Sequence, residues 1–366
     1  MKITFFGAYD PAYPRSAVIR KGLRLNGVDV AECRAAANLK SWVRYPLLMA
    51  RWKRSPDFVF VPEFCQKDVP LAAFLARLAA KQVIFDPLAA RFETKVVDWG
   101  WKPADSPAAW WNFQIDRAAF AAAGLVLADT AAHKAYYCET YGLDGGKVEV
   151  LPLGYDDEAF FPRTAAASPE AGREKEMFKV LFYGSFLPLH GAEVIVEAAK
   201  IVALKDPSVH FKLVGSGRTQ AAVRAGAADS ANVEFLGWQP LGDLPGLIAG
   251  ADVCLGIFGR TEKARRVVPH KTFQCLGMKK ALITSRTPAV EEFFQHKKNI
   301  FLCDEPLAES LAAAVLELKK DRELREAVAG AGFALIREKY SAKAVGRRLL
   351  DIIDGHFRPE RTMRPK

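Results

Sequence analysis

Residues 267–299 carry the residue types and the spacing best suited to binding a phosphate group. Pro269 is favoured at a helix start, and His270, Lys271 and Thr272 follow it in the first turn. A first helical turn presents free backbone N–H groups and the positive end of the helix dipole, and a lysine there adds a full charge. The pattern predicts a phosphate site centred on Lys271. The alternative is an ordinary strand and helix with a surface lysine.

A second candidate phosphate site is the loop 183–191, which follows one predicted strand and opens a helix. Gly184 lets an anion approach the backbone, and Ser185 follows it. His190 lies near the helix start and is a candidate pH-sensitive donor, with helix capping or packing as the alternative. The two loops together predict an anion site built from backbone, lysine and histidine.

Gly215, Gly217 and Arg218 also stand between a predicted strand and a predicted helix. The third glycine of a dinucleotide fingerprint is missing, because Gln220 occupies its place, so the pattern excludes a dehydrogenase of that type. Arg218 remains a candidate ligand for a diphosphate.

The segment that begins at Pro269 resembles the donor-binding segment of retaining glycosyltransferases of family 4. The family pattern is roughly P-x-K-x-F-[EQ]-x-[LM]-A-x-G-[KR]-P-V-I-T, followed by P-A-x-x-E and a later Asn. The matches are Pro269, Lys271, Phe273, Gln274, Leu276, Lys280, Ile283, Thr284, Pro288, Ala289, Glu292 and Asn299. Further blocks follow the family's order along the chain, among them FFGAYDP, FDPL, LADT, LPLG, FYGSFLPLHG and FLGWQPLGDL.

The resemblance implies a role for each matched position. Asp86, Lys271 and His190 are the expected catalytic residues, and Arg15 is expected to meet an anionic acceptor. Gly237 and Trp238 are expected in the loop that contacts the nucleobase. The residues expected to bind the donor and its phosphates are Gly7, Gly184, Ser185, Arg218, Arg266, Lys271, Gln274 and Glu292.

Several of these residues depart from the family's usual types. Ser185 and His190 stand where many relatives carry arginine and lysine, and Asp86 stands where many keep a histidine. Arg266 and Gln274 occupy positions where most members have two glutamates. An arginine cannot accept hydrogen bonds from sugar hydroxyls, so Arg266 is expected to bind phosphate or an anionic sugar instead.

The resemblance implies a GT-B fold, an α/β architecture of two doubly wound Rossmann-like domains facing a central cleft, with a C-terminal helix that crosses back to the N-terminal domain. The expected function is retaining transfer of a sugar from a nucleoside diphosphate sugar to a hydroxyl acceptor, lipid-linked or a glycan, in cell-envelope glycan biosynthesis. A nucleotide-sugar 2-epimerase of the same architecture and a non-catalytic nucleotide-sugar-binding module are the alternatives.

Length and pattern agree with two domains, because 366 residues exceed the size at which a single core stops growing. Alternating strands and helices predict parallel sheets. Expected boundaries are 1–160 for the acceptor-side domain, 161–177 for a linker or insertion, 178–340 for the nucleotide-sugar domain and 341–366 for the crossover helix and tail. Predicted strands are 3–6, 28–31, 58–61, 83–85, 125–128, 148–151, 180–183, 211–214, 233–235, 253–256, 281–284 and 300–303.

Composition limits the remaining possibilities. No D-x-D pair and no ligand cluster appears, so we expect no metal and no cofactor beyond the nucleotide sugar. The six cysteines show no paired spacing and are expected to be reduced. No signal peptide and no membrane-spanning apolar run appears, which predicts a cytoplasmic protein.

The net charge of +10 is concentrated near the N-terminus, where ten Lys or Arg residues lie between positions 15 and 54 against two acidic residues. The segment 40–54 interleaves these cations with Trp42, Leu47, Met49 and Trp52. This pattern suits peripheral attachment to an anionic membrane on its inner face. The alternative is a helix that buries its apolar side chains, and no nucleic-acid-binding module accompanies the charge.

Overall fold

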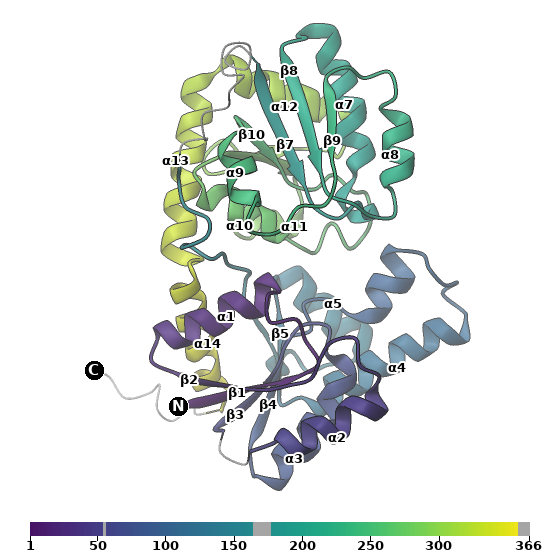
Figure 1. The fold of residues 1–366 in the computed structure, drawn as a ribbon, viewed down its shortest axis with the longest axis vertical. Coiled ribbons are helices and arrows are strands. Elements are labelled where there is room, and N and C mark those ends of the chain that lie inside the picture. The colour runs from purple at the N-terminus through teal and green to yellow at the C-terminus, as the bar shows by residue number, and fades with distance from the viewer. Residues whose placement is uncertain (54–55, 164–176, 358–366) are drawn as a thin grey trace. The chain divides into compact units, whose positions relative to one another are not determined.

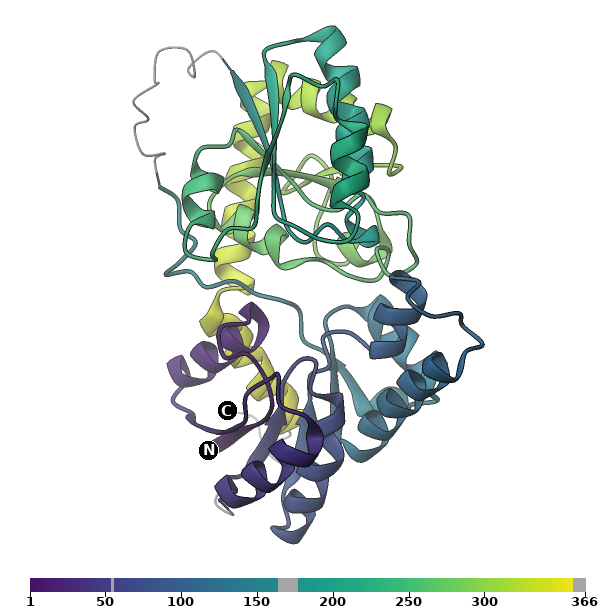
Figure 2. The same ribbon diagram turned by 45° about the vertical axis from the view of Figure 1, so that its right-hand side comes forward.

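The computed structural model describes residues 1–53, 56–163 and 177–357, and these form two compact units. Unit 1 consists of Met1–Gly154 with Tyr340–Lys366, and unit 2 consists of Tyr155–Lys339. Most of the predicted linker, residues 164–176, lies outside the described residues. The predicted α/β fold of two doubly wound domains is confirmed: each unit has one six-stranded parallel sheet with helices on both faces (Figures 1 and 2).

Unit 1 has the strand order β2-β1-β3-β4-β5-β6. Short strands such as FVFV in β3 are buried along their whole length, as expected for a parallel sheet covered on both faces. The order reverses direction between β1 and β3, which is where open α/β sheets bind ligands. The strands are β1 (Lys2–Gly7), β2 (Asp29–Arg34), β3 (Phe58–Val61), β4 (Gln82–Phe85), β5 (Leu125–Ala128) and β6 (Val148–Val150).

Two helices of unit 1 begin at a side-chain cap. Ser106 accepts a hydrogen bond from the Ala109 N–H, and Thr130 accepts one from the His133 N–H. The helices are α1 (Pro14–Leu25), α2 (Ser41–Arg51), α3 (Val69–Leu78), α4 (Pro107–Ala122), α5 (Ala131–Tyr141) and α14 (Ala342–Phe357), with short turns η1 (Gln66–Asp68), η2 (Glu93–Asp98) and η3 (Gly145–Lys147).

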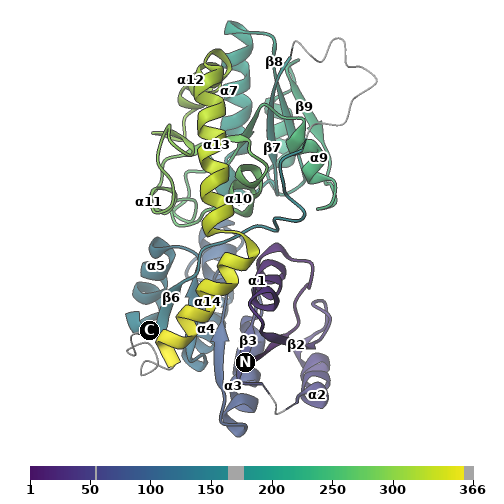
Figure 3. The ribbon, with the colours of Figure 1, turned by 90° about the vertical axis from the view of Figure 1, so that its left-hand side faces the viewer.

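The last helix returns to unit 1, as predicted, and lies along α1 (Figure 3). Gly22 and Gly346 bring the two backbones into contact, since a Cβ added at Gly346 would lie 2.2 Å from the Gly22 carbonyl carbon. The Asn26 side chain also donates to the Lys343 carbonyl at 2.9 Å. Any larger side chain at either glycine must push α14 away from α1.

Unit 2 repeats the plan with the order β12-β11-β10-β7-β8-β9. The strands are β7 (Phe178–Tyr183), β8 (Val209–Val214), β9 (Val233–Leu236), β10 (Val253–Leu255), β11 (Ala281–Ser285) and β12 (Phe301–Cys303). The helices are η4 (Pro188–His190), α7 (Ala192–Lys205), α8 (Gln220–Gly226), α9 (Leu244–Ala249), α10 (His270–Gly277), α11 (Pro288–Glu291), α12 (Ala308–Lys320) and α13 (Arg322–Lys339).

The helix start predicted at Pro269 is confirmed, and a second helix begins at Pro288. Pro269 adopts an extended conformation directly before α10, so that helix begins at His270. Thr287 caps α11 by accepting a hydrogen bond from the Val290 N–H, and Pro288 occupies the first helical position. Both helices therefore start at the carboxyl edge of the unit 2 sheet.

Candidate functional site

Lys271 is a buried cation in the first turn of α10. Its side chain is 5% exposed, and its Nζ lies 3.9 Å from the centre of the Phe182 ring and donates to the Gly256 carbonyl at 3.4 Å. Among the described residues, no carboxylate lies within ion-pair distance of it. Burial lowers the pKa of Lys271 from 10.5 to about 7, because charging the amine here costs solvation that nothing nearby replaces. The ammonium group is therefore poised to bind an anion.

Gly184 leaves the space that such an anion needs. A Cβ placed on Gly184 would lie 3.0 Å from the Lys271 Nζ and 3.3 Å from the His190 ring, so the bare backbone at 184 borders both side chains. The structure thus brings together three residues that the sequence assigned to one site. Ser185, the next residue, is exposed.

His190 is buried, and its Nδ1 donates to the Ser185 carbonyl, which can only accept. Burial, followed by the charge of Lys271, lowers the pKa of His190 well below its usual 6.5. The ring is therefore neutral near pH 7, and its single N–H is spent on Ser185. His190 can donate to an anion only after Nε2 is protonated, which the second charge of a bound diphosphate would favour.

Gln274 lies one turn after Lys271 on α10 and is also buried. Its Oε1 accepts a hydrogen bond from the Tyr183 hydroxyl at 2.8 Å, which fixes the orientation of the amide. The amide nitrogen remains as a hydrogen-bond donor, at a position where the family resemblance implies a glutamate acceptor.

The two glycines after β8 explain why the chain resembles a dinucleotide fingerprint without being one. A Cβ on Gly215, whose φ is +129°, would lie 2.0 Å from the Gly184 carbonyl oxygen, and a Cβ on Gly217 would lie 2.5 Å from the Phe186 nitrogen. These glycines let the loops after β7 and β8 pack backbone against backbone. Their conformation therefore supports the loop at Gly184.

The other predicted donor residues follow neighbouring strands at the same edge of the sheet, because parallel strands all end on one side. Arg218 is exposed after β8, Gly237 and Trp238 are exposed after β9, and Glu292 is exposed after α11. Arg266 is partly buried, and its Nη2 lies 3.6 Å from the Glu262 carboxylate. No contact in the structure tests the roles of these residues as ligands.

In unit 1, Arg15 and Asp86 form a buried ion pair. Arg15 Nε donates to Asp86 Oδ2 at 2.7 Å, and both side chains are 1% exposed. The remaining guanidinium nitrogens donate to the Pro152 carbonyl at 2.7 Å and the Leu151 carbonyl at 2.9 Å. The expectation that Arg15 meets an anionic acceptor does not fit this arrangement, because the side chain is buried and each of its three guanidinium nitrogens already donates inside the fold. Asp86 is likewise engaged as the partner of Arg15.

Glu63 is a candidate site residue that the sequence analysis missed. It follows β3 next to the reversal of strand order, is 2% exposed, and accepts a hydrogen bond from the Ser16 hydroxyl at 2.7 Å. Its Oε2 has no hydrogen-bond partner among the described residues. Burial, and then the negative charge of Asp86, raises the pKa of Glu63 to about 7. An acidic residue two positions after the apolar strand FVFV was the available signal.

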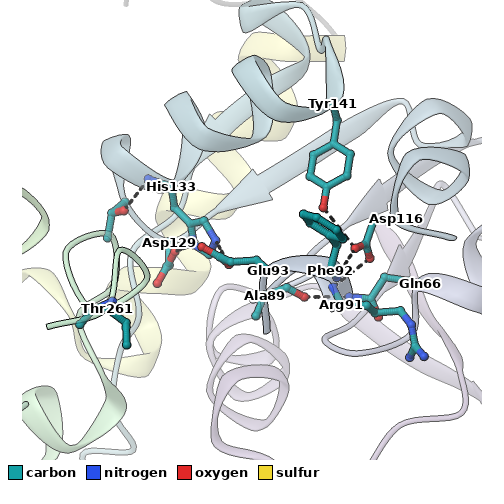
Figure 4. A network of polar contacts seen from close by, with 12 residues as sticks. Gln66, Ala89, Arg91, Phe92, Glu93, Asp116, Asp129, His133, Tyr141 and Thr261 are labelled. Atoms are coloured by element: carbon teal, nitrogen blue, oxygen red, sulfur yellow. Dashed lines mark hydrogen bonds and ion pairs between the residues drawn. The ribbon is translucent and has the colours of Figure 1, made fainter. Parts of the chain in front are cut away.

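A network around His133 supports the loops of unit 1 (Figure 4). His133 Nδ1 lies 2.6 Å from Asp129 and Nε2 lies 3.1 Å from Glu93, with all three side chains buried. Burial alone would lower the pKa of His133, but the negative charges of Glu93 and Asp129 outweigh burial and raise the pKa to about 9. The ring is therefore charged at neutral pH. Asp129 belongs to the LADT block, and the network ties that block to η2.

Within residues 1–53, 56–163 and 177–357, no group of three or more His, Cys, Asp or Glu residues is placed to hold a metal ion. In the same ranges, no helix has the length and apolar character to span a bilayer.

Comparisons with known proteins support the resemblance to glycosyltransferases. Residues 178–321 match the model of the family described as "Glycosyl transferases group 1". The lipopolysaccharide core biosynthesis glycosyltransferase LpsD of Rhizobium meliloti is 26% identical over 245 residues, which cover 62% of this chain and 68% of LpsD. A GDP-mannose-dependent monoacylated alpha-(1-6)-phosphatidylinositol monomannoside mannosyltransferase of Corynebacterium glutamicum is 26% identical over 221 residues, 57% of each protein.

Solved structures share the whole fold. Anabaena Alr3699/HepE in complex with UDP and glucose has a TM-score of 0.72 at 15% identity, covering 97% of this chain and 100% of that one. Sucrose-phosphate synthase from Thermosynechococcus elongatus has a TM-score of 0.71 at 14% identity, covering 98% of this chain and 99% of that one. The predicted resemblance is therefore confirmed: residues 178–321 match the group 1 glycosyltransferase model, and the chain shares the GT-B fold of these solved structures.

Proposed function

We propose that this glycosyltransferase moves a sugar from a nucleoside diphosphate sugar to a hydroxyl acceptor, with retention of configuration and without a metal ion. One observation carries the proposal: the Lys271 ammonium group is buried beside Gly184, and no carboxylate among the described residues pairs with it. A buried cation without a counter-charge is costly. A diphosphate bound against Gly184 supplies that counter-charge, and the solved HepE complexes contain UDP and UDP-glucose.

In the proposed reaction the bond between the anomeric carbon and the diphosphate breaks, and the acceptor oxygen forms its new bond on the same face. The acceptor's proton passes to the departing phosphate oxygen, as the resemblance to family 4 implies. Lys271 and the N-terminus of α10 stabilise the negative charge on the leaving group. Gln274, held by Tyr183, donates its amide N–H to the donor. The interactions of these groups with the diphosphate strengthen as negative charge develops on it, so they lower the barrier to sugar transfer.

We assign the acceptor to unit 1 and the donor to unit 2. Glu63, with a pKa of about 7, is able to accept a hydrogen bond from an acceptor hydroxyl or to donate one to its oxygen. The relatives named for lipopolysaccharide core synthesis and for a phosphatidylinositol monomannoside support an envelope glycan or lipid-linked acceptor. Such an acceptor fits a cytoplasmic enzyme attached to the inner face of a membrane.

Attachment through α2 is part of this proposal. Leu48 is fully buried and Trp52 packs against Phe6, but Trp42 is 76% exposed and Met49 is 51% exposed. The helix therefore buries one apolar stripe and leaves a second one in solvent. The second stripe is available for a lipid surface, while Arg54 lies outside the described residues.

The test is turnover of a panel of nucleotide sugars by the wild-type protein and by Lys271→Ala. We expect hydrolysis of at least one sugar in the absence of acceptor, and a loss of about 100-fold or more in the variant, which is typical for removing one electrostatic stabiliser. Lys298→Ala, an exposed lysine in the same unit, is the control and should keep full activity.

Two outcomes of this assay would replace the proposal. Release of an epimerised free sugar without acceptor would identify a nucleotide-sugar 2-epimerase. Binding of a nucleotide sugar, seen as a raised melting temperature, with no hydrolysis or transfer would identify a non-catalytic binding module. Normal turnover of a folded Lys271→Ala protein would remove Lys271 from the site.

A further inference from the structure

A group of four cations lies at the carboxyl edge of the unit 1 sheet. Arg44 is on α2, Lys67 is in η1 after β3, and Arg91 and Lys95 lie in the loop and the π-helical turn after β4. The side chain of Gln66 donates to the Ala89 carbonyl at 2.8 Å and so holds η1 against the loop that carries Arg91 (Figure 4). We call Arg44, Lys67, Arg91 and Lys95 the basic cluster.

Among the described residues, the carboxylates whose charges act on Lys67, Arg91 and Lys95 are Asp68 and Asp116, and both are already engaged. Asp68 accepts from Arg44 Nε at 2.7 Å and from the Ala8 N–H at 2.9 Å, which joins the cluster to the loop after β1. Asp116 accepts from the backbone N–H groups of Arg91 at 3.0 Å and Phe92 at 2.8 Å. The cluster thus keeps an excess of two positive charges.

Three of the four cations make no direct side-chain ion pair with a described carboxylate. Among the described residues, no carboxylate is within ion-pair distance of the side chains of Lys67, Arg91 or Lys95, and Arg91 Nε is buried without a hydrogen-bond partner. Burial, then the charges of Arg91 and Lys67, lowers the pKa of Lys95; burial, then Arg91 and Arg44, lowers that of Lys67. Each cation therefore makes its neighbours harder to charge, and an anion would relieve that repulsion.

An aromatic rim borders the cluster. Lys95 Nζ lies 5.8 Å from the centre of the Trp101 ring, which is 46% exposed and contacts Trp99 edge-on. An aromatic side chain next to cations suits a ligand that carries a charged group on an apolar or sugar body. The position next to the reversal of strand order in the unit 1 sheet is the expected place for such a ligand.

We propose that the basic cluster binds a phosphate group on the acceptor substrate. This inference rests on the proposed transferase function and names the acceptor's chemical class. A phosphate monoester carries nearly two negative charges at neutral pH and so matches the excess of the cluster, whereas a carboxylate would leave one cation unpaired. The phosphate comes either from a soluble phosphorylated acceptor or from a lipid headgroup.

The experiment is a titration with inorganic phosphate at constant ionic strength, followed by tryptophan fluorescence in a Trp238→Phe background. Six of the seven tryptophans lie in residues 42–111, so this background reports on unit 1 and not on the Lys271 site. We expect a saturable signal, and an affinity reduced about ten-fold or more in Lys67→Gln/Lys95→Gln, the scale of lost hydrogen bonds to a charged group.

Arg77→Gln/Lys81→Gln is the matched control, because it removes two cations at the opposite edge of the same sheet. It should bind phosphate like the wild type. Vesicles containing phosphatidic acid distinguish the two sources: sedimentation with them, reversed by inorganic phosphate, indicates a lipid headgroup, and absence of sedimentation indicates a soluble acceptor. No saturation in the wild type, or equal loss in both double variants, would overturn the proposal.

The titration does not depend on turnover. If the wild-type protein hydrolyses no nucleotide sugar yet binds phosphate through the cluster, the transferase function fails and the phosphate site stands. If it hydrolyses a nucleotide sugar and transfers the sugar equally well to phosphorylated and unphosphorylated acceptors, the site fails and the function stands.

Discussion

Replacing Lys271 by Met should make the protein more stable while it removes the anion site. Met has nearly the same length and volume as Lys but no charge to desolvate, and the Lys271 side chain is 5% exposed. The pKa of Lys271 falls from 10.5 to about 7. At 1.36 kcal/mol for each pKa unit, this corresponds to about 5 kcal/mol of lost solvation of the charged amine.

The stabilisation should depend on pH in one direction. Between about pH 7 and pH 10.5 the unfolded chain binds a proton at Lys271 and the folded chain does not. The free energy of unfolding of the wild-type protein therefore falls by about 1.4 kcal/mol for each pH unit as the pH is lowered through this window, and not further below pH 7. The Met variant lacks this slope, so its advantage grows from pH 9 to pH 7 by about 3 kcal/mol.

Urea unfolding followed by circular dichroism at pH 7, 8 and 9 measures this difference. Lys298→Met is the matched control, because Lys298 is exposed in the same unit. Its unfolding free energy should run parallel to that of the wild type. Parallel curves for Lys271→Met as well would show that Lys271 is solvated or paired in solution, and the reasoning that makes it the anion-binding cation would be refuted.

Other properties follow from the same structure. The affinity for a nucleoside diphosphate should fall as the pH rises above about 7, by at most about ten-fold per unit, and calorimetry should find no such dependence in Lys271→Met. Transfer activity should survive EDTA; complete loss, restored by magnesium or manganese, would contradict the metal-free proposal. Arg51→Gln/Lys53→Gln should lower sedimentation with phosphatidylglycerol vesicles at low salt without lowering the melting temperature, and no wild-type binding would leave α2 a solvated helix. Gly346→Val should cost about 1–3 kcal/mol by forcing α14 away from Gly22, and an unchanged melting temperature would argue against that contact.

The sequence predicted the sheets well because their strands are short, apolar and bounded by turn residues. Strand 58–61 matches β3, and the predicted strands 180–183 and 300–303 differ from β7 and β12 by one or two residues at their ends. The proximity of Lys271 to the Gly184 loop could also be predicted, because both follow parallel strands and the resemblance placed them in one site.

Pairings between side chains far apart in the sequence could not be predicted. Arg15 and Asp86 are 71 residues apart, and nothing in either local sequence shows that they satisfy each other inside the fold. The same is true of His133 and Glu93, which are 40 residues apart. The sequence of 40–54 shows that cations alternate with apolar residues, but not which apolar residues are buried. In the structure Leu48 is buried and Trp42 is exposed.

The return of α14 to unit 1 has a consequence for how the chain is made on the ribosome. Unit 2 is continuous from Tyr155 to Lys339, so it can fold as soon as it emerges. Unit 1 must wait for α14 to cover α1 through Gly22 and Gly346. At about 5–20 residues per second, that delay is roughly 10–40 seconds, during which the apolar surface of α1 stays open. The first unit to be translated is thus the last to be completed, and the open face of α1 is where a nascent-chain chaperone is expected to bind.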